Sequence, residues 1–190
     1  MMGAGWGKGT GSNPAAPGAL LLAPVDTRLF ERPLDHLAAE NARLLRVCAQ
    51  LEIIALNAAR LAQHSIPILV PYLRWDYSSH LDWMERRFFP LLEAACFVGD
   101  AVSGPIAQLV LEHGLDRSMA ARLAGLLTEY GQTPSEGLEQ RVKLTSESFA
   151  ETQKRHVAWL EMTVFPLAQE RLTEEHMKEL TRGLQVHYRR

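Results

Sequence analysis

The sequence predicts an all-α protein: an antiparallel up-down four-helix bundle with a short C-terminal fifth helix and a disordered N-terminal lead. Apolar residues recur at helical spacing through most of the chain. Glycine and proline residues divide this pattern into four long segments with short connections, as in an antiparallel bundle. No alternating apolar run bounded by turn residues indicates a strand.

The first two helices follow from the position of prolines and apolar residues. The first is expected to begin near Pro33, because proline is favoured in a first helical turn, and to end near His64. Its apolar stripe consists of Leu34, Leu37, Leu44, Val47, Leu51, Ile54 and Ala58. The second is expected to run from Pro67 or Pro71 to about Ala95.

The next two helices have clear boundary signals. The third is expected from about Pro105 to Tyr130, with Gly131 as its C-terminal cap. Ser135 is a candidate N-cap for a long fourth helix that ends near Glu170. Both segments carry apolar residues at helical spacing, so they complete the bundle.

The two ends of the chain and one internal proline complete the outline. Thr173 is expected to cap the short fifth helix, whose first turn is acidic. Residues 1–28 are rich in Gly, Ala and Pro and are expected to be disordered, which leaves 29–190 as one domain. Pro90 should interrupt the second helix, because a proline ring does not fit a regular helix interior.

Composition excludes several classes of partner. The formal net charge is -2 and no basic cluster is present, so neither nucleic acid nor an anionic membrane is an expected partner. No apolar run is long enough to span a bilayer. Cys48 and Cys96 do not make a disulfide framework, which indicates a reducing, cytoplasmic location. The sequence identifies no protein partner, and a homodimer is compatible with it.

An internal repeat contains the most informative residues. Residues 80–91 and 156–167 both read His, hydrophobe, any residue, Trp, hydrophobe, Glu, two variable residues, hydrophobe, Phe, Pro, Leu. The repeat therefore predicts two equivalent helices, each of which offers an imidazole and a carboxylate to a shared centre.

Four of the seven histidines lie on predicted inner faces, one on each long helix. A lone histidine on an apolar face is usually a satisfied core residue, but four such residues beside two repeated carboxylates would be costly to bury unpaired. A metal removes that cost by binding neutral imidazoles and ionised carboxylates. The candidate ligands are His36, His80, Glu85, His113, His156 and Glu161.

The ligand types indicate the metal. Imidazole and carboxylate without thiolate suit iron, with manganese and zinc as alternatives. Six ligands suit two ions bridged by carboxylates and a solvent-derived oxo or hydroxo group better than one tetrahedral zinc. His80 and Glu85 are five residues apart, as are His156 and Glu161, so each pair lies about 140° apart on a regular helix and flanks the inner stripe.

These residues resemble the hemerythrin-like, or HHE cation-binding, domain family over about residues 30–185. The matching motifs are Asp35-His36, the block from His80 to Pro90, Glu112-His113, and the block from His156 to Pro166. The resemblance implies a four-helix bundle that holds a non-haem di-iron centre and binds oxygen.

One departure limits the implied function. The residues four positions from His113 are Leu109 and Arg117, so the second histidine that oxygen-carrying members have on this helix is missing. Glu112, Glu40 or solvent are candidates for the vacant position. The departure argues against a reversible oxygen carrier and favours a site open to a small ligand.

The leading prediction is a protein that binds or senses oxygen, nitric oxide, peroxide or iron. Two alternatives remain: a di-iron oxidoreductase that reduces peroxide or nitric oxide, and a metal-free helical interaction module. The sequence favours binding or sensing over catalysis, because it shows no dedicated general acid or substrate cavity.

Overall fold

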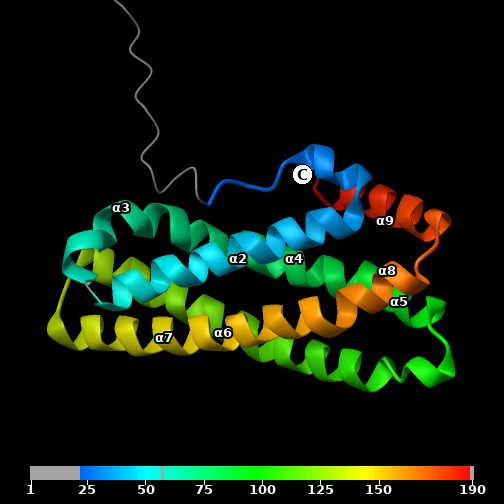
Figure 1. Ribbon diagram of the computed structural model, residues 1–190. Coiled ribbons are helices and arrows are strands. Elements are labelled where there is room, and N and C mark those ends of the chain that lie inside the picture. Colours follow the sequence, from blue (N-terminus) through cyan, green and yellow to red (C-terminus); the bar gives the residue numbers. More distant parts are fainter. Residues whose placement is uncertain (1–21, 57, 189–190) are drawn as a thin grey trace, which may run out of the picture.

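Four long helical segments lie side by side and alternate in direction in the computed structural model, which describes residues 22–56 and 58–188 (Figure 1). The first segment is α2 (Pro33–Leu56) and the third is α6 (Ser103–Gln132). The second comprises α3 (Ala58–Pro71), η2 (Tyr72–Asp76), α4 (Tyr77–Trp83), η3 (Met84–Phe88) and α5 (Phe89–Ala95). The fourth comprises α7 (Glu136–Trp159), η5 (Leu160–Val164) and α8 (Phe165–Arg171). The described residues contain no strand, and the predicted all-α bundle is confirmed.

Shorter elements cover the bundle. They are η1 (Thr27–Glu31), η4 (Val98–Asp100) and α9 (Glu174–His187). Figure 1 shows η1 and α9 close together along one side of the bundle, and they are in contact. Most of the predicted disordered lead, residues 1–21, lies outside the described residues, whereas Leu22 is buried and its carbonyl accepts a hydrogen bond from Arg43 Nε at 3.1 Å.

Both predicted N-caps are confirmed. The Ser135 hydroxyl accepts a hydrogen bond from the Leu138 N–H at the start of α7. The Thr173 hydroxyl accepts from the His176 N–H at the start of α9, and His176 Nδ1 accepts from the Thr173 N–H at 3.2 Å. These bonds satisfy backbone donors that a helix start leaves unpaired.

The predicted end of the first helix is wrong. The first helix was expected to continue to His64, but α2 ends at Leu56 and His64 lies in α3. The prediction failed because no glycine or proline lies between Leu56 and Pro67 to mark the break, while Pro67 and Pro71, which suggested a later start, lie inside α3.

Gly131 is not a helix cap, because α6 continues to Gln132 and Thr133 follows as the C-cap. A Cβ at Gly131 would meet the Cδ1 atom of Ile66 at 3.3 Å. The glycine therefore allows α3 to pack closely against α6. Gly131 is required for this helix packing, and not for the helix end that the sequence suggested.

π turns interrupt both copies of the repeat at equivalent positions. The turn η3 covers Met84–Phe88 just before Pro90, and η5 covers Leu160–Val164 just before Pro166. Proline has no N–H to donate and its ring clashes with the preceding turn, so a wider turn before it accommodates the ring. The predicted interruption at Pro90 thus takes the form of a π turn.

The core consists of two apolar clusters along the bundle. One contains Leu44, Leu51, Leu123 and Phe149 with their neighbours, and the other contains Leu37, Trp83, Phe88, Leu160 and Val164 with theirs. Both Cys48, which is buried, and Cys96, which is half-buried, are free thiols. Trp83 is 1% exposed and stacks on Phe88, so it is part of this core.

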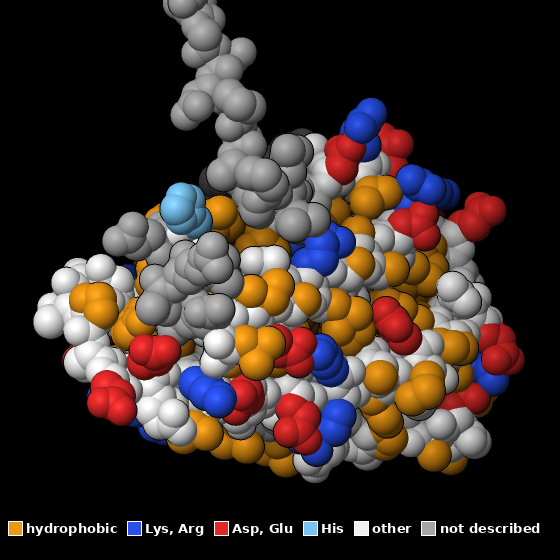
Figure 2. All heavy atoms as spheres, turned by 60° about the vertical axis from the view of Figure 1, so that its left-hand side comes forward, with side chains coloured by type: hydrophobic (Ala, Val, Ile, Leu, Met, Phe, Trp, Pro, Cys, Tyr) orange, Lys and Arg blue, Asp and Glu red, His pale blue; other side chains and the backbone are white. Residues whose placement is uncertain are grey.

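The surface and the helix composition agree with the low net charge. Figure 2 shows acidic and basic side chains interspersed over one face, with apolar patches between them. Among the described helices, none has the length and apolar character that crossing a membrane requires.

Candidate functional site

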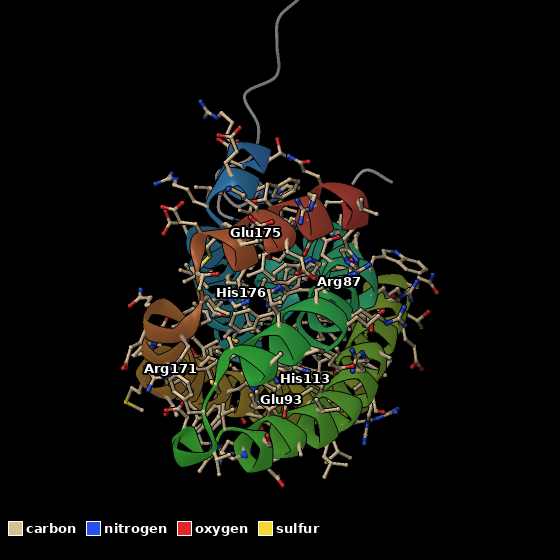
Figure 3. All side chains as sticks on the ribbon, turned by 90° about the vertical axis from the view of Figure 1, so that its right-hand side faces the viewer. Arg87, Glu93, His113, Arg171, Glu175 and His176 are labelled. Atoms are coloured by element: carbon tan, nitrogen blue, oxygen red, sulfur yellow. The ribbon has the colours of Figure 1, made fainter. Side chains whose placement is uncertain are left out.

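Four histidine side chains, one from each helical segment, are buried where the two apolar clusters meet. His36 on α2 is 1% exposed, His80 on α4 is 6%, His113 on α6 is 0% and His156 on α7 is 7%. Figure 3 shows His113 inside the bundle, seen from the end where α5 and α8 lie. The predicted inward position of all four residues is confirmed.

The four imidazoles lie close enough to affect one another. The ring centroids of His113 and His156 are 5.1 Å apart. Burial, reinforced by repulsion from His36, His113 and His156, lowers the pKa of His80 to about 3. Burial also lowers the pKa of His36 to about 4, and burial with repulsion from His113 lowers that of His156 to about 4. These side chains are therefore neutral at pH 7, which is the form in which imidazole binds a metal.

Several buried ring nitrogens have no hydrogen-bond partner. They are Nδ1 and Nε2 of His36, Nδ1 of His80, Nε2 of His113 and Nδ1 of His156. Leaving a buried polar atom unpaired costs about 1–3 kcal/mol, and native structures rarely retain several in one place. A metal cation that accepted these lone pairs would remove the cost. The imidazole set therefore fits a metal in its donor chemistry.

Glu85 fixes the orientation of one imidazole. Its Oε1 atom lies 2.8 Å from His113 Nδ1 and accepts a hydrogen bond from Arg117 at 2.9 Å. Burial raises the pKa of Glu85, but the hydrogen bonds from Arg117 and His113 outweigh it and hold the pKa below its usual value. Because the carboxylate is an acceptor, the Nδ1 atom carries the proton and Nε2 keeps the free lone pair. Carboxylates commonly orient metal-binding histidines in this way.

Glu161, the equivalent carboxylate in the second repeat, has different surroundings. Its side chain is exposed, and within the described residues no hydrogen bond or ion pair joins it to an imidazole. The structure therefore brings Glu85 to the histidines and does not bring Glu161 there. In this side-chain arrangement, the described His, Cys, Asp and Glu residues form no group of three or more that could hold a metal.

A second polar layer lies one helical turn from the histidines, and most of its residues were not predicted from the sequence. Tyr77, three residues before His80, is fully buried and donates its hydroxyl to Gln153 Oε1 at 2.8 Å. Asp116 is 3% exposed, and burial raises its pKa, with hydrogen bonds to Gln153 and Tyr77 acting against the shift. The sequence signal for this layer is a polar residue one helical turn from each of the predicted ligands.

Glu40 belongs to the same layer on α2. It is 6% exposed, and burial raises its pKa to about 7 although the positive charge of Arg43 acts in the opposite direction. The other sequence candidate for the vacant ligand position, Glu112, is half-buried and accepts a hydrogen bond from Gln108 at 2.9 Å.

Aromatic residues from the two ends of the described chain cover His36. Its ring centroid lies 5.1 Å from that of Phe30 in η1 and 5.4 Å from that of Tyr188 after α9. His187 is half-buried, and its Nε2 atom lies 2.8 Å from the Ser79 hydroxyl. The terminal elements therefore form one wall of the site.

Comparison with known families agrees with this geometry. The family model described as "Hemerythrin HHE cation binding domain" matches residues 32–168, which include the four buried histidines and both repeats. No curated protein and no solved structure is matched by the chain.

Proposed function

Because the chain belongs to the hemerythrin HHE cation-binding domain family, we propose that it binds two iron ions and thereby binds or senses a small oxidant. The oxidants that fit are oxygen, nitric oxide and peroxide, with iron itself as a further candidate signal. One observation supports the proposal above the others: four helices place four neutral imidazoles in one buried layer with unpartnered ring nitrogens. When bound, iron would supply the redox chemistry that imidazole and carboxylate side chains lack.

The ligands we propose are the four imidazoles together with Glu85 and Glu161. Glu85 already lies beside His113, and it could serve as a ligand or as the group that orients this imidazole. No hydrogen bond or ion pair among the described residues holds Glu161, and it follows His156 through the same kind of π turn as Glu85 follows His80. Binding would therefore turn this exposed side chain toward the histidines and draw the other proposed ligands closer together than the described arrangement places them.

Metal analysis tests the proposal directly. The full chain is expressed in iron-supplemented medium, purified without a metal-binding tag, and its metal content per chain is measured by elemental analysis. About two iron ions per chain are expected, with a marked loss in His80→Gln and His113→Gln. His64→Gln is the matched control, because His64 is exposed. No bound metal after anaerobic reconstitution with ferrous iron would refute the proposal and leave the metal-free interaction module.

A specific observation favours the enzyme alternative as a second candidate. A cavity of about 690 Å³ between α6 and α7 is lined by both His156 and the buried acid Asp116. A substrate in that cavity would lie beside the proposed metal ligand His156 and a buried carboxyl group, which are the kinds of group that a reductase needs. Steady-state consumption of peroxide or nitric oxide with a chemical reductant would support this candidate, and stoichiometric binding without turnover would exclude it.

We propose a cytoplasmic location, which the two free thiols support.

A further inference from the structure

The cavity between α6 and α7 has the size and shape of a small-molecule site. Its volume of about 690 Å³ lies within the range of ligand pockets in proteins. Apolar side chains make much of its wall: Pro105, Leu109, Leu115, Met119 and Trp159. Leu115 is 72% exposed, so this lining residue lies at the mouth of the cavity.

Two buried polar side chains reach this cavity. Asp116 is 3% exposed and His156 is 7% exposed. The Oδ2 atom of Asp116 and the Nδ1 atom of His156 have no hydrogen-bond partner. Both atoms are shielded from solvent, and Gln153 and Tyr77 hydrogen-bond to the same Asp116 carboxyl group. A cationic group that reached this carboxyl group through the cavity would offset the cost of burying its charge.

The charges around the cavity specify what that atom should be. Glu112, one turn before Asp116 on α6, adds a second carboxylate to the same wall. Arg155 is the opposing charge, but it is exposed and forms no ion pair with any described residue. The interior therefore offers hydrogen-bond acceptors with negative charge, next to an apolar surface.

We propose that the α6–α7 cavity binds a small organic cation, with an ammonium group at Asp116 and a short apolar chain against Leu109, Met119 and Trp159. The ammonium donates a charge-assisted hydrogen bond to the Asp116 carboxylate and compensates its buried charge. The chain removes apolar surface from water at the mouth of the cavity. Asp116, which anchors the cation, is not among the proposed metal ligands, whereas His156 in the same wall is, so binding is measured with and without metal.

Three ligands with the same apolar chain test the proposal: n-hexylamine, n-hexanol and hexanoate. Binding to the full chain is measured by calorimetry at pH 7 and constant ionic strength, both after chelator treatment and with the protein as purified. We expect n-hexylamine to bind at least tenfold more tightly than n-hexanol, and hexanoate to bind most weakly. Equal binding of the amine and the alcohol would overturn the proposal, because it would show an apolar cavity without charge recognition.

Variants locate the binding to this cavity. Asp116→Asn keeps the shape of the side chain and is expected to reduce amine binding to the level of the alcohol, whereas Glu129→Gln on the exposed face of α6 should change neither. Leu115→Trp narrows the mouth at an exposed position and should weaken the amine and the alcohol alike. Because this position is exposed, the variant is expected to fold even if Asp116→Asn does not. Unchanged amine affinity in Leu115→Trp would place the binding elsewhere and refute the proposal.

Metal content separates this result from the proposed function. Wild-type protein that binds iron but does not bind n-hexylamine would refute the cation site alone. Protein that binds the amine but no iron would refute the iron proposal alone.

Discussion

Replacing His36 with phenylalanine should make the metal-free protein less sensitive to acid. His36 is 1% exposed, and burial lowers its pKa to about 4. Below about pH 6.5 the unfolded chain takes up a proton at this histidine while the folded chain does not, so protonation favours unfolding. The loss of unfolding free energy begins near the pKa of the histidine in the unfolded chain, grows as the pH falls and is complete below about pH 4. It amounts to roughly 3 kcal/mol for this one residue.

The folded site should accept the phenylalanine ring. His36 already contacts Phe30 and Tyr188 through aromatic edges, and neither of its ring nitrogens has a partner. His36→Phe therefore removes two unpaired polar atoms and keeps an aromatic ring between the same neighbours. At pH 7 the metal-free variant should be at least as stable as the metal-free wild type. As purified, the variant should contain less iron than the wild type.

Urea unfolding of chelator-treated protein at pH 7, 6, 5 and 4 measures the effect. The free energy of unfolding of the wild type should fall more steeply with acid than that of His36→Phe, by roughly 3 kcal/mol between pH 7 and pH 4. His64→Gln, at an exposed position, is the control and should follow the wild type. Parallel pH profiles for the wild type and His36→Phe would refute the argument that burial keeps this imidazole neutral.

Three further predictions concern the ligands, the second polar layer and a helix cap. Glu85→Gln and Glu161→Gln should each lower the iron content per chain, and full retention in Glu161→Gln would show that the repeat does not assign this ligand. Tyr77→Phe leaves the Oε1 atom of Gln153 without its donor and should cost about 1 kcal/mol in urea unfolding, with no change in iron content. Ser135→Ala removes the cap of α7 and should lower the free energy of unfolding by about 1 kcal/mol, whereas Ser135→Asp should retain it.

Periodicity predicted the histidine layer because the helices are long and amphipathic. A residue on the apolar stripe of such a helix must face the core, so His36, His80, His113 and His156 could be placed without knowing how the helices pair. The helix starts at Ser135 and Thr173 could also be predicted from the sequence, because a cap is a local interaction between residues three apart.

The missed features depend on contacts between distant segments. Gly131 suggested a helix end, but its role is set by Ile66 on another helix. The position of Asp116 beside Gln153 and Tyr77 requires the relative register of three helices, and the cover over His36 requires that Phe30 and Tyr188 meet. Sequence patterns within one helix do not contain that information.

The two repeats show how similar local sequences can produce unequal sites. Both copies form a π turn before Phe-Pro, so the backbone at Glu85 and Glu161 is alike. The difference comes from α6, whose Arg117 reaches back to both Asp82 and Glu85 and holds this carboxylate against His113. No described ion pair holds Glu161. A carboxylate already held near its partner loses less freedom on binding a metal, so the side of the centre nearest Glu85 should bind its ion first.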